Sequence, residues 1–409
     1  MRDRKKKIII VSQYFPPETG AASSRMGDLS KQLSLDNYEV TVLTEIPNYP
    51  EGKITNGYSL GLLKREKVGT VQVFRSFVLP TKRRNFLERA IFYVSFFLGT
   101  LINSFRLPAA DIVMGTSPSP LTALSAWFIA RIKGAKFVLD IRDLWPASII
   151  SLTHMKSGLV VFVLKKLEKF LYNRADLISL AVPGFREHII GVVDKPKNYI
   201  DLLNGAPDEF FEVEESNISI EGLPNLDGKF VVFFSGNHGI AQATDTLIKA
   251  AEKLKESDKI HFLFVGNGIC KPAMIKLSKE SGLTNTTFIG SQPRKKMPHI
   301  IDMASLCVVP LRRLPIFEHA MPSKMFEYMA RGKPIILSVL GEAKTLLEES
   351  GGGICIEPEN HKELADTILT LYENSEMASQ LGKNGKEFVR NNYRKSVIIE
   401  NFSKALKEV

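Results

Sequence analysis

The sequence has few of the features that mark exported, disulfide-stabilised or metal-binding proteins. Its 409 residues include three cysteines, Cys270, Cys307 and Cys355, which are widely spaced and fall in or beside apolar runs. An odd, scattered set argues against a disulfide framework or a zinc site, and predicts reduced core residues. Residues 1–7 are charged and lead into an apolar run without a signal-peptide core, so we expect a cytoplasmic protein.

Two nucleotide and metal signatures are also missing. Residues Lys7–Gly27 contain no GxGxxG pattern, which counts against a dinucleotide-dependent oxidoreductase. No DxD pair follows a strand candidate, and no His/Asp cluster has ligand spacing. We therefore expect no metal site and no bound cofactor.

Positive charge is concentrated in the first quarter of the chain. Residues 1–110 hold 17 Lys and Arg against 9 Asp and Glu, whereas the other 299 residues hold 37 against 35. Such a basic face suits anionic lipid, a phosphorylated acceptor or nucleic acid. A merely solvated surface is the alternative.

An uncharged segment, Ala90–Phe105, follows a basic cluster in this quarter. Its sixteen residues are fewer than the ~20 that span a bilayer. We expect a helix that is buried on one side and dips into the membrane interface on the other, although a plain core helix fits equally well. The residues expected at the membrane are Arg83, Arg84, Phe92, Phe96 and Phe97.

Short apolar runs alternate with amphipathic stretches, which is typical of parallel sheets covered by helices. The strand candidates of the first half are Lys7–Ser12, Glu39–Leu43, Asp111–Gly115, Lys136–Asp140, Leu177–Ala181 and Tyr199–Leu203. Those of the second half are Lys229–Ser235, Ile260–Gly266, Thr287–Gly290, Leu306–Pro310, Pro334–Ser338 and Gly353–Ile356.

This repetition predicts an α/β protein with two Rossmann-like domains, residues 1–205 and 206–389. We expect a C-terminal helix, about residues 390–409, to pack back on the first domain. Ligands of open α/β sheets bind beyond the carboxyl ends of the strands, so we expect the site in a cleft between the domains.

The strongest local signal is the segment Glu318–Arg331. Pro322 and Ser323 fit the first turn of a helix, where proline is tolerated, serine can cap and free N–H groups form an anion site. Glu327 emerges one turn later on the same face, placed to accept hydrogen bonds from a ribose diol. An ordinary capped helix is the alternative.

Five separated motifs make a family resemblance specific. They are PSKMFEYMARGKPII from Pro322, VSQYFPPETG at Val11–Gly20, RDLWP at Arg142–Pro146, Asn204–Gly205 and SGNHG at Ser235–Gly239. In this order they resemble the GT4 family of glycosyltransferases, in particular the branch that assembles O-antigen, capsule or colanic acid sugars. The resemblance covers nearly the whole chain and implies the two-domain GT-B fold.

The resemblance also implies donor-site roles. Glu327 matches the acid that binds the nucleotide ribose, and Pro322, Ser323 and Lys324 lie at the helix start that faces the diphosphate. In the family seven residues separate two acids, but here eight separate Glu318 from Glu327, and His319 has the usual place. Glu318 is the candidate for contact with the donor sugar, or its role has changed.

Relatives often have an arginine and a lysine after the first strand of the donor domain, and both are missing here. We expect backbone amides at Gly236, Asn237 and Gly239, aided by His238, to bind the diphosphate instead. A loop histidine bonded to backbone is the alternative for His238. Arg294, Lys295 and Lys324 are candidates for the charge, although a solvated helix face is an alternative for Lys295.

In the acceptor half, Gly20 would let backbone approach a phosphate or donor sugar. Arg142 is a candidate for binding the acceptor diphosphate, with Trp145 beside it, and Asp143 for accepting a proton or orienting the acceptor. A structural Arg–Asp pair remains open.

The resemblance implies a retaining transfer without metal. The expected donor is a UDP-sugar, either an N-acetylated hexosamine or a deoxyhexosamine, and the expected acceptor is an undecaprenyl-diphosphate-linked saccharide. The protein would work peripherally at the inner face of the membrane, and nucleic acid is not an expected partner. Two alternatives are a nucleotide-sugar epimerase and a non-enzymatic basic membrane-binding protein.

Overall fold

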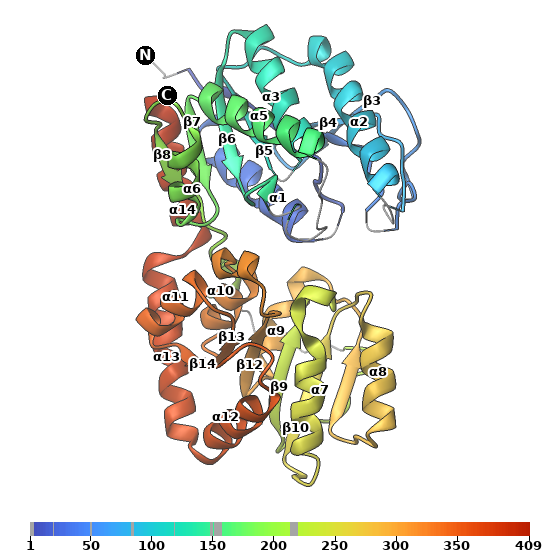
Figure 1. Ribbon diagram of the computed structural model, residues 1–409, viewed down its shortest axis with the longest axis vertical. Helices are drawn as coiled ribbons and strands as arrows, with labels where there is room; N and C mark the ends of the chain where they lie inside the picture. Colours follow the sequence, from blue (N-terminus) through green and yellow to red (C-terminus); the bar gives the residue numbers. More distant parts are fainter. Residues whose placement is uncertain are drawn as a thin grey trace. The chain divides into compact units, whose positions relative to one another are not determined.

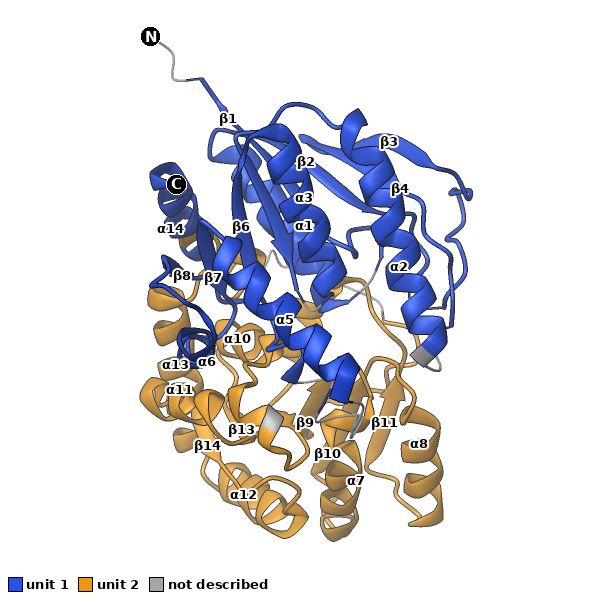
Figure 2. Ribbon diagram, turned by 45° about the horizontal axis from the view of Figure 1, so that its top comes forward, with its two compact units in different colours: residues 1–204, 398–409 blue, residues 205–397 orange. Residues whose placement is uncertain are grey.

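The chain forms two compact units, residues 1–204 with 398–409 and residues 205–397 (Figure 2). The computed structural model describes residues 4–409 except residues 19, 50, 83–85, 118, 148–149, 151–157 and 213–219. Each unit is built on one mainly parallel sheet with helices packed against it (Figure 1).

Unit 1 contains an eight-stranded sheet in the order β3-β4-β2-β1-β5-β6-β7-β8. All neighbouring strands are parallel except β3 and β4, which form an antiparallel hairpin at the edge. The strands are β1 (Lys6–Val11), β2 (Tyr38–Glu45), β3 (Leu63–Val68), β4 (Val71–Ser76), β5 (Ile112–Thr116), β6 (Lys136–Ile141), β7 (Leu177–Leu180) and β8 (Tyr199–Asp201).

The sequence pattern does not predict the hairpin β3–β4. Its first strand, LKREKV, is mostly charged and has no buried residue, because it forms the edge of the sheet. Charged side chains on an edge strand discourage pairing with other chains. Five of the six predicted strands of this half are central and apolar, as expected for strands covered on both faces. The sixth, β8, forms the opposite edge of the sheet and has no buried residue.

The helices of unit 1 include α2, α3 and α5, of which α2 packs beside α3 and α3 beside α5. Ser119 accepts a hydrogen bond from the Thr122 amide to cap α3, and Gly134 ends that helix in a left-handed conformation. The helices are α1 (Ala21–Leu35), α2 (Phe86–Asn103), α3 (Pro120–Lys133), α5 (Gly158–Arg174), α6 (Phe185–Val192) and most of α14 (Lys395–Glu408).

Unit 2 contains a six-stranded, fully parallel sheet in the order β11-β10-β9-β12-β13-β14. This is the order of a doubly wound nucleotide-binding fold, and it reverses between β9 and β12. The strands are β9 (Phe230–Ser235), β10 (Ile260–Val265), β11 (Thr286–Ile289), β12 (Leu306–Pro310), β13 (Ile335–Ser338) and β14 (Gly353–Cys355). Each lies within two residues of its predicted position.

An aromatic and aliphatic core holds the sheet of unit 2 to its helices. Phe234, Phe262 and Phe264 are buried in it together with Leu247 and Ile368. Fully burying one such side chain contributes about 1.5–3 kcal/mol. The helices are α7 (Thr244–Lys253), α8 (Lys271–Glu280), α9 (Met297–Asp302), α10 (Ser323–Ala330), α11 (Glu342–Ser350), α12 (His361–Glu373) and α13 (Ser375–Asn392).

The last helix returns the chain to unit 1. Ile398, Ile399 and Phe402 of α14 are buried, and the Tyr38 hydroxyl donates to the carbonyl of Ser403 at 3.0 Å. Just before α14, the Ala206 amide donates to the carbonyl of Tyr393 at 2.8 Å. The two chain passages that connect the units therefore run side by side at residues 206 and 393.

Candidate functional site

In unit 2, two loops leave the sheet where its strand order reverses. Residues 236–243 follow β9, and residues 311–322 follow β12 and lead into α10. Ligands of doubly wound sheets bind at this point, beyond the carboxyl ends of the strands. The predicted donor residues of the Ser235–Gly239 motif and of α10 are brought together there.

A buried tyrosine fixes α10 against the end of β9. The Tyr328 hydroxyl accepts a hydrogen bond from the Ser235 amide at 2.9 Å and lies 3.0 Å from the Ser235 hydroxyl. Burial raises the pKa of Tyr328 well above its usual value, so the phenol stays protonated. The first turn of α10 therefore has a defined position relative to the loop after β9.

Lys324 places a positive charge at this junction. Its ammonium lies 4.1 Å from the centroid of the Phe234 ring and 3.4 Å from the position that a β-carbon on Gly236 would occupy. Burial lowers the pKa of Lys324 to about 8, although the charge of Glu327 opposes that shift. A partly desolvated cation beside a helix N-terminus favours binding of an anion.

The Ser235–Gly239 loop packs directly on the loop after β10 through glycines. A β-carbon on Gly266, whose φ is +137°, would lie 2.0 Å from the carbonyl oxygen of Gly236. The amides of Gly236 and His238 donate to the carbonyls of Val265 and Asn267, each at 2.9 Å. The prediction that the Gly236 amide binds the diphosphate is therefore wrong, because that N–H is already used.

The amides of Asn237 and Gly239 in this loop remain candidates for binding the diphosphate. Among the described residues, the N–H groups of Asn237 and Gly239 have no backbone acceptor. Ser323 does not cap α10, since Pro322 is the N-cap residue and no side chain there accepts an amide hydrogen bond. Ser323 is instead the first helical residue.

His238 is fully buried and stacks on Phe234 with ring centroids 5.4 Å apart. Burial, with smaller effects of Lys271 and Lys324, lowers its pKa to about 4, so the imidazole is neutral at physiological pH. Neither ring nitrogen has a hydrogen-bond partner among the described residues. Its backbone, in contrast, is hydrogen-bonded on both sides.

The remaining predicted donor residues lie in short 3₁₀ turns. Glu318 is exposed in the turn Pro315–His319, and His319 lies 3.2 Å from the carboxylate of Glu342. Arg294 forms an ion pair with Glu209 at 3.3 Å, and Lys295 beside it is exposed.

In unit 1, a buried ion pair lies at the carboxyl ends of β6 and β7. The Arg25 guanidinium is 3.1 Å from the Asp140 carboxylate, which also accepts hydrogen bonds from Thr116 and Ser179. Arg25 also donates to the Asn204 side chain at 3.0 Å. Arg25 and Asp140 therefore form a buried structural ion pair in this region.

Arg142 follows β6 and adds a second guanidinium. Burial, then the nearby charge of Arg25, lowers the pKa of Arg142 to about 10, whereas Asp140 and Asp143 act in the opposite direction. Its amide donates to the Ser117 hydroxyl at 2.8 Å. Arg25 and Arg142 thus lie close together at this edge of the sheet, near the carboxylates of Asp140 and Asp143.

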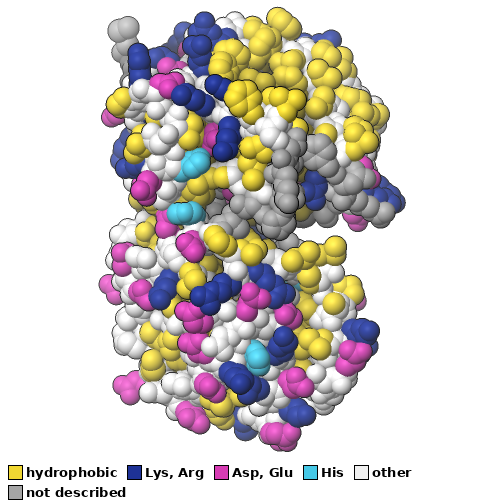
Figure 3. All heavy atoms as spheres, viewed as in Figure 1, with side chains coloured by type: hydrophobic (Ala, Val, Ile, Leu, Met, Phe, Trp, Pro, Cys, Tyr) yellow, Lys and Arg dark blue, Asp and Glu magenta, His cyan; other side chains and the backbone are white. Residues whose placement is uncertain are grey.

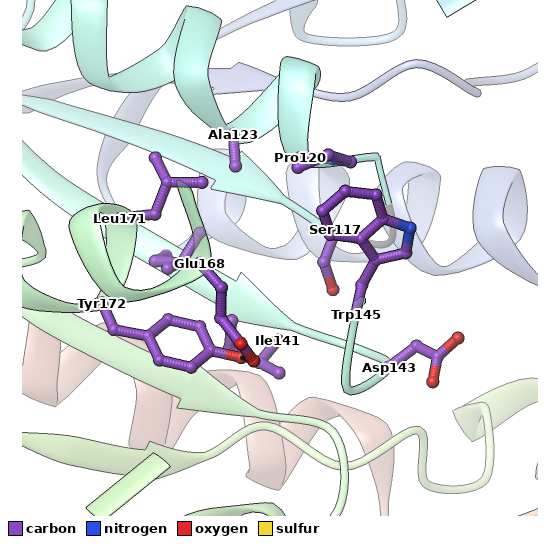
Figure 4. A pocket seen from close by; sticks show the side chains of 10 residues that line it. Ser117, Pro120, Ala123, Ile141, Asp143, Trp145, Glu168, Leu171 and Tyr172 are labelled. Atoms are coloured by element: carbon purple, nitrogen blue, oxygen red, sulfur yellow. Dashed lines mark hydrogen bonds between the residues drawn. The ribbon is translucent and has the colours of Figure 1, made fainter. Parts of the chain in front are cut away.

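Asp143 and Trp145 line a small pocket next to Arg142 (Figure 4). Gly20 lies elsewhere in the unit, directly before α1, with a φ of +124° that disfavours other residues. The described acceptor residues Arg142, Asp143 and Trp145 are thus placed together by the turn after β6.

Two family models match the chain in succession. The model described as "Glycosyl transferase 4-like domain" matches residues 20–199, and the one described as "Glycosyl transferases group 1" matches residues 216–388. The chain belongs to the GT4-type glycosyltransferases. It is therefore an enzyme, as the motifs predicted.

Curated relatives of this glycosyltransferase match most of its length. It is 25% identical to the putative colanic acid biosynthesis glycosyl transferase WcaI of Escherichia coli, over 88% of this chain and 91% of that protein. It is 24% identical to the probable glycosyltransferase WbjE of Pseudomonas aeruginosa, over 80% of this chain and 82% of that protein.

Solved structures confirm the GT-B fold. Sucrose-phosphate synthase from Thermosynechococcus elongatus matches with a TM-score of 0.72 and 17% identity, covering 98% of both chains. HepE of Anabaena, in complex with UDP and glucose, matches with a TM-score of 0.70 and 15% identity, covering 99% of this chain and 100% of that chain.

The glycosyltransferase does not expose the aromatic residues that were expected at the membrane. Phe92 and Phe96 of α2 are buried against Ile46 and Val78, so this part of the prediction is wrong. Phe97 is half-buried, and Arg83 and Arg84 lie outside the described residues. The opposite side of α2 is exposed instead, at Leu87, Ile91, Val94, Leu98 and Ile102.

Helical spacing explains this reversal. Phe92 and Phe96 are four residues apart and share the core side, whereas the exposed residues follow at intervals of three and four on the other side. A segment that is apolar all round does not show from sequence which side faces the core. No helix in the described residues is long and apolar enough to cross a membrane.

One arginine of the donor unit was missed by the sequence analysis. Arg312, just after β12, pairs with Asp245 at the start of α7 and with Glu359, each at 2.6 Å. Its amide donates to the carbonyl of Ala241 at 2.8 Å. Arg312 thus connects the loop after β9 to the loop after β12. Its position directly after a buried strand is the sequence feature that could have identified it as a site residue.

Proposed function

We propose that this glycosyltransferase moves a sugar, with retention of configuration, from a UDP-sugar to a lipid-linked saccharide in surface polysaccharide assembly. The observation that carries the proposal is the Lys324 ammonium at the start of α10, beside the glycine loop and one turn before Glu327. The names of two neighbours support it, since WcaI is assigned to colanic acid biosynthesis and HepE binds UDP-glucose.

The donor diphosphate would lie against Lys324 and the N-terminus of α10. The first N–H groups of the helix have no acceptor within the helix itself. Among the described residues, the amides of Asn237 and Gly239 donate to no backbone carbonyl. Glu327 would accept hydrogen bonds from the ribose hydroxyls. Glu318, exposed in its turn, is the residue proposed to contact the donor sugar.

The proposed reaction requires stabilisation of the charge on the leaving phosphate and does not require a nucleophile from the protein. As the bond between the anomeric carbon and the diphosphate breaks, negative charge grows on the leaving phosphate, where Lys324 and the helix N-terminus stabilise it. The acceptor hydroxyl attacks on the same face of the sugar, and its proton goes to the leaving phosphate oxygen or to Asp143. The protein supplies these interactions without a metal or cofactor in this scheme.

The acceptor would be held by unit 1. Arg142, a guanidinium directly after β6, is suited to bind an acceptor diphosphate. Undecaprenyl diphosphate carrying a saccharide has this group next to a long apolar chain, so the enzyme would work at the inner face of the membrane.

The lipid contact is proposed for the exposed side of α2. Leu87, Ile91, Val94, Leu98 and Ile102 form a single apolar stripe, and Arg89 on the same helix is exposed. Figure 3 shows hydrophobic side chains gathered over the region of α2, α3 and α5. An apolar helix face with basic neighbours binds the interface of an anionic bilayer without crossing it.

A panel of UDP-sugars tests the reaction. N-acetylated hexosamine, deoxyhexosamine and glucose donors would each be incubated with a synthetic phenoxyundecyl diphosphate carrying one sugar, and released UDP would be measured. We expect one donor to be consumed only when the acceptor is present, with an α-linked donor giving an α-linked product by NMR. Consumption of no UDP-sugar would contradict the donor assignment, and an inverted product would contradict retention.

A further inference from the structure

A small pocket in unit 1 has no role in the donor chemistry. It lies beyond the carboxyl ends of β5 and β6, between α3 and α5 (Figure 4). Most of its wall is apolar, from Pro120, Ala123, Ile141 and Leu171 among others. Its volume, taken as the room for the centre of a water molecule, is about 20 Å³. One water needs about 10–15 Å³ on this measure, so a single methyl-sized group fits.

One wall of this pocket carries a buried carboxylate. Glu168 is 6% exposed, and its Oε1 accepts a hydrogen bond from the Tyr172 hydroxyl at 3.1 Å and lies 2.9 Å from His188 Nε2. Burial and the charge of Glu168 raise the pKa of Tyr172 well above its usual value, so the hydroxyl remains a donor. These contacts hold the carboxylate in one orientation.

The second oxygen of Glu168 is available to a ligand. Tyr172 and His188 both hydrogen-bond to Oε1, and within the described part of the chain no hydrogen bond involves Oε2. An ionised carboxylate only accepts hydrogen bonds, so the group that it recognises must donate one. The pocket therefore combines an apolar hollow with one acceptor.

Trp145 forms the flat side of the pocket. Figure 4 shows its indole beside Pro120 and Ser117, while the Asp143 carboxylate points away from Glu168. An indole face packs well against the apolar face of a sugar ring. Trp145 follows Arg142 by three residues, which places the hollow next to the proposed diphosphate contact.

We propose that this pocket recognises an acetamido group on the acceptor sugar, with the methyl in the hollow and the N–H donating to Glu168. In a planar trans amide, the methyl and the N–H lie on the same side of the C–N bond, so one wall can contact both. A sugar hydroxyl donates but leaves the hollow empty, and a deoxy-sugar methyl fills it without donating. The inference deepens the proposed function and rests on it.

A matched pair of acceptors tests this subsite. Phenoxyundecyl diphosphates carrying N-acetylglucosamine or glucose differ only in the group that the pocket would bind. Calorimetric titration into the full-length enzyme should give about tenfold or tighter binding for the acetamido compound, since hydrogen bonds to charged groups are worth about 1.5–3 kcal/mol. Equal affinities, or binding of neither compound, would overturn the proposal.

Two variants connect that preference to the pocket. Glu168→Gln keeps the shape of the side chain and removes its charge, and Ala123→Val fills the apolar hollow. Each variant should reduce the affinity ratio between the acetamido and glucose acceptors to about twofold or less. Glu187→Gln, an exposed glutamate on α6, is the matched control and should keep it. A full preference in both pocket variants would place the selectivity elsewhere.

UDP binding separates the failure of this inference from failure of the proposed function. UDP affinity should be unchanged in Glu168→Gln and Ala123→Val, because the residues proposed to bind UDP lie in unit 2. If the wild-type enzyme bound no UDP, the donor assignment would be at fault. If UDP bound normally and both acceptors bound equally, only the acetamido pocket would be wrong.

Discussion

The two units share a doubly wound sheet but differ in what lies at the carboxyl ends of their strands. In unit 2 the strand ends carry a glycine loop, the start of α10 and the Lys324 cation. In unit 1 the same edge is occupied by the buried Arg25–Asp140 pair and a methyl-sized pocket. The shared fold supplies the scaffold, and the side chains in the loops decide which part of a reaction each unit can serve.

The outer helices differ as well. In unit 1 the apolar stripe of α2 is exposed along its length, and α5 exposes Leu159, Val160, Phe162 and Val163. In unit 2 the exposed large apolar residues, such as Ile240, Ile269 and Tyr372, lie on separate elements. Scattered apolar residues are normal on soluble surfaces, whereas a continuous stripe marks a contact surface.

The largest expected effect concerns the buried pair of unit 1. Arg25→Met would leave the Asp140 carboxylate fully buried without its cation, so we expect a loss of about 3–5 kcal/mol in the free energy of unfolding. Denaturant melts measure this. Arg186→Met, which removes an exposed pair with Asp201, should cost at most about 1 kcal/mol. A loss for Arg25→Met as small as that for Arg186→Met would contradict the stabilising role of the buried pair.

The next effect is on the pH dependence of nucleotide binding. The Lys324 pKa is lowered to about 8, so the ammonium is present below that pH and is lost as the pH rises through it. UDP affinity measured by calorimetry should fall about tenfold between pH 7 and pH 9, following the protonated fraction. Lys324→Arg keeps its charge and should flatten the profile, and the same fall in both proteins would exclude Lys324 as the cause.

The smallest effect concerns the surface of unit 1. Leu98→Ser on the exposed stripe should weaken binding to vesicles of phosphatidylglycerol about fivefold, since part of one side chain no longer enters the interface. Flotation measures the bound fraction. Ile240→Ser, a change at an exposed isoleucine of unit 2, is the control. A similar loss in both variants would remove the distinction between the two surfaces.

Much of the fold follows from sequence because central parallel strands are continuous apolar runs. The edge hairpin β3–β4 does not, since its charged strand has no such run. Lys324 and Glu327 could be placed together because one helical turn connects them. Glu168 could not, because the chain brings it to Ser117 and Trp145 only through the packing of α5 on α3, and no local spacing encodes that contact.

Some details of the site depend on backbone hydrogen bonds that sequence does not specify. The Gly236 amide is used by Val265, although its glycine pattern is typical of phosphate loops. Outside the site, the orientation of α2 also cannot be predicted from the sequence, since both of its faces are apolar and the side-chain packing of Phe92 and Phe96 decides which one is buried.

The most direct test of the donor site is UDP binding to Glu327→Ala, compared with Glu348→Ala as an exposed control in the same unit. Losing the ribose contacts should weaken UDP binding by about tenfold or more, with the thermal melt unchanged and the control unaffected. Wild-type affinity in a folded Glu327→Ala protein would contradict the assignment of α10 as the donor site.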